Sequence, residues 1–235
     1  MTAGPPRLRE RLSPGWLHRA LLARRGAIQA PLGRAWRNEL TALRETRRRT
    51  ALLMNDAAAL QIQICVRAAR ARAGVMAEAG VFMGGSARLI CAAKGDVPLH
   101  LFDVFDTLQA GGASTATGAA EVRAHFGELH GKQEQVEQLL AAYPAVQLHP
   151  GVFPTSTAGL EALRFSFVHL DLDLPGATRE GLAFFHPRLT PGAILIGDDH
   201  DDPGVRAVFA DYFAGLNDTV IDLPWGQVMV VRQGP

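Results

Sequence analysis

The strongest constraint on the fold is a glycine-rich turn between a predicted strand and a predicted helix. The sequence from Glu78 to Ser86 reads EAGVFMGGS, with the apolar run Val75 to Ala77 before it and the helix-compatible run Ala87 to Ala93 after it. Glycines let the backbone approach a ligand closely, and a helix N-terminus offers free N–H groups and a positive dipole end. The stretch therefore predicts a parallel α/β sheet with a ligand-binding turn at the carboxyl end of a strand.

The spacing of the glycines argues against a dinucleotide as the ligand. A dinucleotide turn has the pattern G-x-G-x-x-G, whereas Gly80, Gly84 and Gly85 fall as G-x-x-x-G-G. Glu78, two residues before the first glycine, suits a ligand with a cationic amino group, such as the amino-acid end of S-adenosylmethionine (SAM). An ordinary strand–helix turn that only packs tightly stays open as the alternative.

Length and composition are those of a globular protein with one sizeable core. The chain has 235 residues, of which 48% are hydrophobic and 20% are charged. Cys65 and Cys91 lie in apolar surroundings with no spacing motif, so we expect reduced core cysteines and a cytoplasmic location. We expect no membrane span and no signal peptide, because no apolar run has the required length or position.

Charge is distributed unevenly along the chain. Residues 1–77 contain 15 arginines and four acidic residues, while residues 78–235 contain nine basic and 19 acidic residues. The basic part could bind nucleic acid, or it could pack as an amphipathic element against the acidic body or a second subunit. Apolar residues at helical spacing favour packing. We therefore expect an Arg-rich helical extension over residues 1–50, an α/β domain over 51–235 and a homodimer or larger homo-oligomer, with nucleic acid unlikely as a partner.

After the turn, strand-like and helix-like runs alternate, which predicts a mostly parallel sheet with right-handed crossovers. The strand-like runs are Leu99–Asp103, Val146–Leu148, Phe165–Asp171, Ala193–Ile196, Thr219–Leu223 and Gln227–Val231. The helix-like runs are Ala35–Ala73, Gln133–Ala142, Ala158–Leu163, Thr178–Phe185 and Val205–Phe213. Only three residues separate the last two strands, so that pair should form an antiparallel hairpin. Gln109–Ala120 is small and flexible in composition and is expected to be a lid or loop.

Acidic residues close several of the predicted strands. Asp103 closes one, Asp171 and Asp173 follow another, and Asp198 and Asp199 follow a third. Neighbouring parallel strands lie about 4.8 Å apart, so carboxylates at adjacent strand ends should converge. Converging carboxylates repel one another unless a proton or cation lies between them, and oxygen ligands favour Mg²⁺, Mn²⁺ or Ca²⁺. The alternative is a set of helix caps and solvated loop acids.

Taken together, these motifs resemble those of the class I SAM-dependent O-methyltransferases, and most closely the macrocin O-methyltransferase family. The resemblance covers about Val75 to Phe213. It rests on the turn from Glu78 to Leu89, the segment Phe102–Phe105, Gly151–Pro154, the motif His169–Leu174, Pro191–Gly192 with Ile196–Asp199, and Pro203–Arg206. It implies a Rossmann-like fold with a seven-stranded sheet, mostly parallel, that ends in an antiparallel hairpin. It also implies methylation of a hydroxyl on a small, sugar-bearing or polyhydroxylated metabolite.

The resemblance assigns roles to particular residues. Glu78, Gly80, Gly84 and Ser86 would bind the methionine part of SAM, Asp103 the ribose, and Gly151 and Phe153 would lie beside the adenine. Asp171, Asp198 and Asp199 would coordinate Mg²⁺. The general base stays open among Asp171, His130 and His200, with His125 as a further candidate. Alternative functions are a metal-independent or N-methylating enzyme and a non-catalytic SAM- or nucleic-acid-binding module.

Overall fold

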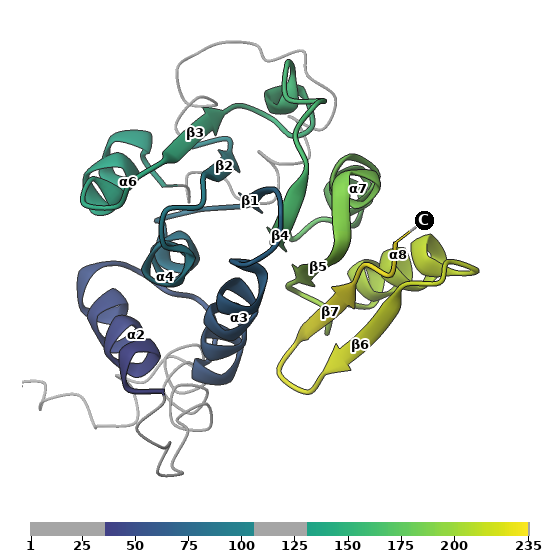
Figure 1. Cartoon of the computed structure of the whole chain (residues 1–235), viewed down its shortest axis with the longest axis horizontal. Coiled ribbons are helices and arrows are strands. Elements are labelled where there is room, and N and C mark those ends of the chain that lie inside the picture. The colour runs from purple at the N-terminus through teal and green to yellow at the C-terminus, as the bar shows by residue number, and fades with distance from the viewer. Residues whose placement is uncertain (1–35, 106–130, 235) are drawn as a thin grey trace, which may run out of the picture.

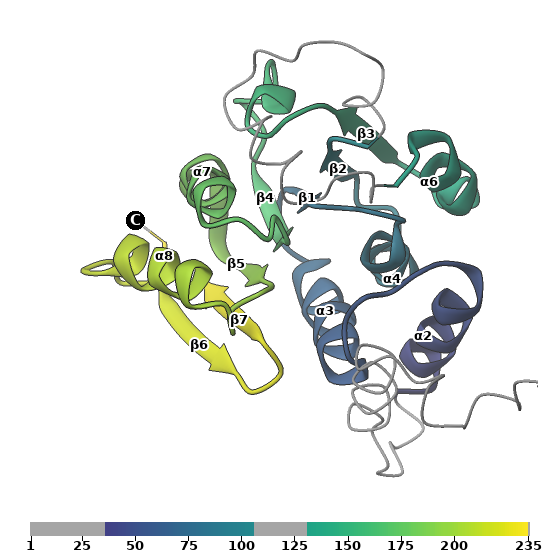
Figure 2. The ribbon, with the colours of Figure 1, turned by 180° about the vertical axis from the view of Figure 1, so that it is seen from behind.

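A seven-stranded sheet forms the centre of the molecule (Figures 1 and 2). The computed structural model describes residues 36–105 and 131–234. The strand order is β3-β2-β1-β4-β5-β7-β6. The strands are β1 (Val75–Ala79), β2 (Leu99–Asp103), β3 (Val146–Pro150), β4 (Phe165–Leu170), β5 (Leu189–Gly197), β6 (Thr219–Leu223) and β7 (Gln227–Val231).

The pairing of the strands confirms the predicted topology. β3, β2, β1, β4 and β5 are parallel, and β7 pairs antiparallel with both β5 and β6. In the register of β1 with β4, Glu78 lies opposite His169. The order reverses at β1, so the carboxyl ends of β1 and β4 lie at the middle of the parallel part, where open α/β sheets bind ligands.

Helices cover both faces of the sheet (Figure 1). They are α2 (Arg37–Arg49), α3 (Asp56–Ala69), α4 (Gly85–Lys94), α6 (Gln133–Leu140), α7 (Pro175–Phe185) and α8 (Pro203–Phe213). Buried residues of α3, α4 and α6 form one core with one face of the sheet, and those of α7 and α8 form a second core with the other face. α2 packs outside α3 and α4, where Leu43 joins a smaller apolar cluster.

The structure corrects two predicted helices. The expected helix over Ala35–Ala73 is two helices, because the chain is extended at Thr50 and a new helix begins after Asn55, whose side chain accepts a hydrogen bond from the Ala58 N–H. The expected helix over Ala158–Leu163 is wrong, because Gly159 has a positive φ of 83° and the segment forms turns after a short 3₁₀ turn, η3 (Thr155–Thr157).

Two other sequence-based expectations lie mainly outside the described residues. Of the Arg-rich extension only residues 36–50 are described, and the expected lid over Gln109–Ala120 is not. Within the described part, α2 is joined to the body by ion pairs of Glu39 with Arg67 and of Glu45 with Arg88. None of the described helices combines the length and the apolar character that a membrane crossing requires.

Candidate active site

The glycine-rich turn brings the backbone of β1 against the backbone that follows β4. Gly80 has a φ of 88°, and a Cβ at this position would collide with the carbonyl oxygen of Asp171. The Asp171 N–H donates to the Ala79 carbonyl at 2.8 Å, which fixes this approach. Gly80 is therefore required for strand packing at the site, whatever else it contacts. Gly84, with a φ of 78°, is the N-cap of α4.

Asp103 holds the turn in place. Its Oδ2 accepts hydrogen bonds from the N–H groups of Val81 and Phe82 at 2.7 and 2.8 Å, and its Oδ1 accepts from the Phe105 N–H at 2.8 Å. A carboxylate can accept about four hydrogen bonds, so the three backbone contacts leave capacity for a ligand hydroxyl. The sequence located Asp103 beside the turn and did not reveal this backbone-binding role.

Glu78 lies beneath the turn and is fully buried. Its Oε1 is 2.8 Å from Nδ1 of His169. Burial raises the pKa of Glu78, while the hydrogen bond from His169 and the nearby Ser86 hydroxyl lower it. Of the residues predicted to bind methionine, Ser86 lines the cavity described below, whereas Glu78, Gly80 and Gly84 do not.

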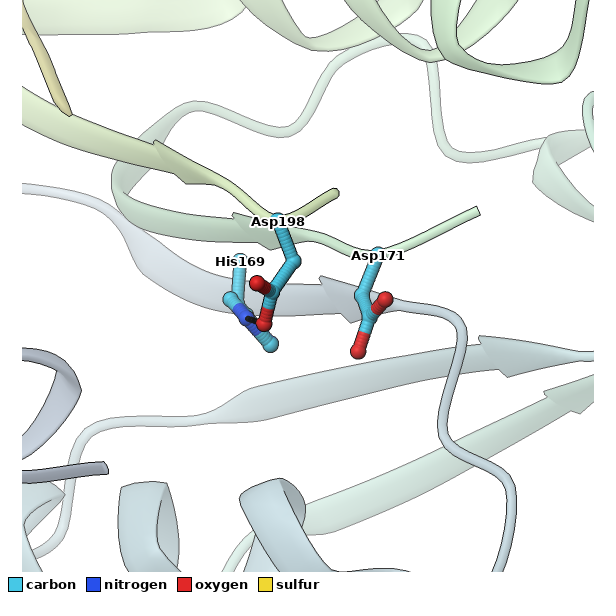
Figure 3. Close-up of side chains that lie close together, drawn as sticks. All are labelled: His169, Asp171 and Asp198. Carbon is cyan, nitrogen blue, oxygen red and sulfur yellow. Dashed lines mark ion pairs between the residues drawn. The ribbon is translucent and has the colours of Figure 1, made fainter. Parts of the chain in front are cut away.

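Carboxylates from β4 and β5 converge beside this turn, as predicted (Figure 3). Candidate ligand atoms of His169, Asp171 and Asp198 lie within 4.8 Å of one another, and so do those of Asp171, Asp173 and Asp199. The two groups share Asp171, and together they contain all three predicted metal ligands. In Figure 3 the side chains of His169, Asp171 and Asp198 extend to the same side of the sheet edge.

Burial and mutual repulsion shift the protonation of this cluster. Burial and the nearby Asp198 raise the pKa of Asp171 well above its usual range. Burial and Asp173 raise the pKa of Asp199 to about 7. For His169, burial lowers the pKa, but the neighbouring carboxylates of Asp198 and Glu78 outweigh it and hold the pKa well above 6.5. Such shifts are common where proteins bind cations or catalyse proton transfer.

The backbone around the cluster is strained. Among the described non-glycine residues, the positive φ angles are those of Phe82, Phe105, Ala145, Asp173 and Asp199, at 50°, 45°, 54°, 57° and 54°. Four of these five follow the carboxyl ends of β1, β2, β4 and β5. Strain of this kind costs about 1–3 kcal/mol per residue and concentrates at functional sites.

A cavity of about 730 Å³ opens over the carboxylates. Its polar side is formed by Ser86 and by Asp171, Asp173, Asp198, Asp199 and Asp201. The rest of its lining includes residues 51–56, which are most of the α2–α3 link and the first residue of α3, together with Phe82 and with Trp225 at the tip of the β6–β7 hairpin. The Asn55 side chain donates to the Trp225 carbonyl at 3.2 Å and so joins the α2–α3 link to the hairpin tip. The cavity is large enough for a small-molecule ligand.

The remaining predicted residues lie elsewhere. Gly151 and Phe153 follow β3, and Phe153 packs on Phe185 with ring centroids 5.5 Å apart. His200 does not face the cluster: its Nε2 is 3.0 Å from Asp222 of β6 and its ring packs on Phe209 of α8. The geometry therefore gives His200 no place as the general base. His125 and His130 lie outside the described residues.

Several site residues were not singled out from the sequence. His169 could have been found, because it lies two residues before Asp171 on a strand and so points to the same face. Trp225 and residues 51–56 carry no comparable signal. They reach the cavity through the hairpin and the break between two helices, which local sequence patterns do not bring together.

Comparison with known proteins identifies the family. The model of the macrocin O-methyltransferase family (TylF) matches residues 45–229. An 8-demethyl-8-(2,3-dimethoxy-alpha-L-rhamnosyl)-tetracenomycin-C 4'-O-methyltransferase from Streptomyces olivaceus is 30% identical in an alignment 177 positions long, and the alignment covers 69% of this chain and 68% of that protein.

Solved structures share the fold at lower identity. The O-methyltransferase NovP has a TM-score of 0.61 at 20% identity, over 74% of this chain and 78% of its own. An O-methyltransferase from Bacillus cereus, solved with S-adenosylhomocysteine (SAH), has a TM-score of 0.54 at 15% identity, over 91% and 97% of the two chains. The glycine-rich turn, the strand-end carboxylates and the family match over residues 45–229 thus lead to one conclusion: the chain belongs to the macrocin O-methyltransferase family and is a SAM-dependent O-methyltransferase.

Proposed function

We propose that this enzyme transfers the methyl group of SAM to a hydroxyl on the sugar of a small natural product, and that the transfer depends on Mg²⁺. The sugar acceptor is suggested by the relative from Streptomyces olivaceus, whose name gives a rhamnosyl tetracenomycin as its substrate. The observation that carries the proposal is the carboxylate cluster on the floor of the cavity. The acceptor hydroxyl and the donor sulfonium would meet there.

Asp171, Asp198 and Asp199 are the residues proposed to hold the cation. Their oxygen ligands suit Mg²⁺, and Oδ2 of Asp199 is buried without a hydrogen-bond partner among the described residues. A buried carboxylate oxygen without a partner is unfavourable unless a proton or cation satisfies it. When bound, the ion would lower the pKa of the acceptor hydroxyl and orient it towards the donor.

The protein's own residues would orient the two substrates. Ser86 and the backbone of the turn would hold the methionine part of SAM, with Asp103 at the ribose and Phe153 near the adenine. Trp225 and Phe82 offer aromatic surface on which a sugar ring or an aglycone can pack. In the reaction the hydroxyl oxygen forms a bond to the methyl carbon while the carbon–sulfur bond breaks, which leaves SAH. The hydroxyl proton would pass to Asp171, which lines the cavity and belongs to both groups of acids.

A transfer assay with SAM labelled in the methyl group tests this function. Neutral rhamnosyl glycosides serve as acceptors, with Mg²⁺ or with EDTA. We expect transfer with Mg²⁺, loss of transfer in EDTA, and recovery when Mg²⁺ is restored. Asp199→Asn should reduce the rate at least about 100-fold, because a ligand to the ion is lost.

The matched control for this assay is Asp202→Asn. Asp202 lies three residues from Asp199 but caps α8, where its Oδ1 accepts from the Gly204 and Val205 N–H groups. This variant should transfer methyl groups at close to the wild-type rate. Transfer that is unaffected by EDTA and by Asp199→Asn would contradict the metal-dependent mechanism and favour a metal-independent methyltransferase.

A further inference from the structure

A buried polar chain connects the donor-binding turn to the carboxylate cluster. It begins at Ser86, whose hydroxyl lies close enough to the Glu78 carboxyl group to lower its pKa. Glu78 contacts Nδ1 of His169 at 2.8 Å, and Nε2 of His169 is 3.6 Å from Oδ2 of Asp198. The side chains of Glu78 and His169 are both 0% exposed. Ser86 and Asp198 line the cavity, so the chain joins two parts of the cavity wall through the protein interior.

The chain continues on the other side of Asp198. The Gln227 side chain, which is buried in β7, donates from Nε2 to Oδ2 of Asp198 at 3.4 Å. The Trp225 indole N–H donates to Oε1 of Gln227 at 3.1 Å. The same carboxylate oxygen is thus contacted from β4 and from β7, which restricts its orientation.

The imidazole of His169 suits this position because its two nitrogens lie on opposite sides of a rigid ring. Each nitrogen faces a different carboxylate, so a movement of one carboxylate displaces the ring and with it the other carboxylate. The backbones on either side of the contact are tied together as well, because Glu78 lies opposite His169 in the β1–β4 register. Oε2 of Glu78 and Nε2 of His169 lack a hydrogen bond among the described residues, so the two middle members of the chain are held only through the contacts named above.

We propose that His169 is a positioning residue that couples the donor site to the cation site, so that SAM and the divalent cation each strengthen binding of the other. Binding at Ser86 fixes Glu78 and, through His169, the orientation of Asp198. Ordering of Asp198 by the cation acts in the opposite direction, as reciprocity of coupled binding requires. This inference rests on the proposed cation site.

Two binding measurements test the coupling without an acceptor and without turnover. The affinity for SAH is measured by isothermal titration in EDTA and again with saturating Mn²⁺. The affinity for Mn²⁺ is measured by electron paramagnetic resonance with and without SAH. For the wild-type protein we expect each ligand to tighten the other about tenfold, within the usual range of coupling between sites. We call the factor by which one ligand tightens the other the coupling ratio. In His169→Gln both ligands should still bind, but the coupling ratio should fall to about twofold or less.

A matched control shows whether the effect of His169→Gln comes from the link between the two ligand sites or from the loss of any buried histidine–carboxylate pair. His186 lies in η4 (His186–Arg188), is also buried, and contacts Asp218 at 2.7 Å on the α8 side of the sheet. His186→Gln should lower stability and keep the wild-type coupling ratio. If His169→Gln does not fold, Ser86→Ala cuts the same chain at its other end and should reduce the ratio in the same way.

The outcomes are distinguishable from those that bear on the metal site itself. If the wild-type protein binds no Mn²⁺, the proposed cation site is contradicted and the coupling with it. If it binds both ligands independently, or if His169→Gln keeps the wild-type ratio, the coupling alone is contradicted. Equal loss of the ratio in His169→Gln and His186→Gln would show a general structural effect and would also contradict the proposal.

Discussion

At the scale of single residues, the site is built from positions that would be unfavourable elsewhere. Gly80 takes a φ of 88° against the Asp171 carbonyl, and Asp173 and Asp199 have positive φ angles of 57° and 54°. Glu78 and His169 are charged or polar groups with no exposed surface. Each is held by a neighbour at the same sheet edge, so the site depends on close contact between the ends of β1, β4 and β5.

Gly80→Ala tests that contact. The new Cβ would collide with backbone that cannot move without separating β1 from β4, so we expect a loss of about 3 kcal/mol or more in the free energy of unfolding. SAH binding should be lost with it. Urea denaturation and isothermal titration measure the two effects.

Gly159→Ala is the control for backbone strain alone. Gly159 has a similar φ of 83°, but a Cβ there would meet nothing within 4 Å. In this variant the free energy of unfolding should fall by only about 1–2 kcal/mol, and the affinity for SAH should be unchanged. Equal losses in the two variants would show that the Asp171 contact has no special role.

A second residue-scale prediction concerns pH. Burial, with a smaller contribution from His149, lowers the pKa of His100 to about 4 from an unfolded value of 6.5. The unfolded chain therefore binds a proton at His100 between pH 6.5 and pH 4 that the folded protein does not bind. His100 thus favours folding above pH 6.5, and this contribution is lost progressively as the pH falls towards 4.

His100→Phe should make stability less sensitive to acid. Between pH 7.5 and pH 5 the wild-type protein should lose up to about 2 kcal/mol more than the variant, because only the wild-type has this proton to bind. Urea denaturation at the two pH values measures the difference. A variant that loses as much stability as the wild-type protein over this range would contradict the assignment.

At the scale of elements, most of the sheet could be predicted and most of the cavity wall could not. Alternating strand-like and helix-like runs and the three-residue link Pro224–Gly226 were sufficient for the strands and the final hairpin, which have the predicted directions. The break at residues 50–55 was not predicted. It is stabilised by side-chain contacts: the Arg47 guanidinium donates to the Leu52 and Met54 carbonyls nearby, and the Thr50 hydroxyl donates to the distant Met83 carbonyl.

The hairpin tip gives a prediction at this scale. Trp225→Ala removes the largest aromatic surface of the cavity wall, so the KM for a glycoside acceptor should rise about tenfold or more. SAH affinity should change little, because SAH is proposed to bind at the glycine-rich turn and not at the hairpin tip. Steady-state kinetics and isothermal titration measure these quantities.

Trp36→Ala is the control for loss of a tryptophan. Trp36 precedes α2, where the Arg67 guanidinium lies 5.3 Å from its ring, and it does not line the cavity. It should leave the acceptor KM unchanged. If both variants raise the KM equally, Trp225 is not part of the acceptor site.

At the scale of the whole molecule, the fold brings acidic side chains from two strands to one point, where they repel one another. That these carboxylates converge could be predicted, because parallel strands end at the same edge of the sheet. Their division into two groups of candidate metal ligands that share Asp171 could not be predicted, because it depends on side-chain orientations and on the positive φ of Asp173 and Asp199. The burial of Glu78 behind Ser86 likewise follows from tertiary packing.

Stability without a cation should therefore improve when one carboxylate is neutralised. In EDTA, Asp199→Asn should be more stable than the wild-type protein by about 1–3 kcal/mol, because a charge among close carboxylates is removed. Mg²⁺ should raise the melting temperature of the wild-type protein and not that of the variant. Thermal unfolding in EDTA and in Mg²⁺ measures both; a variant less stable than the wild-type protein in EDTA would contradict the repulsion.

The central claim is that these carboxylates hold one divalent cation on the floor of the acceptor cavity. Mn²⁺ titration followed by electron paramagnetic resonance, in the presence of SAH, tests it most directly. We predict one tightly bound Mn²⁺ per chain, displaced by Mg²⁺, and loss of this binding in the Asp171→Asn and Asp199→Asn variants but not in Asp202→Asn. Absence of bound Mn²⁺ in the wild-type protein, or binding that survives both Asp171→Asn and Asp199→Asn, would contradict the claim.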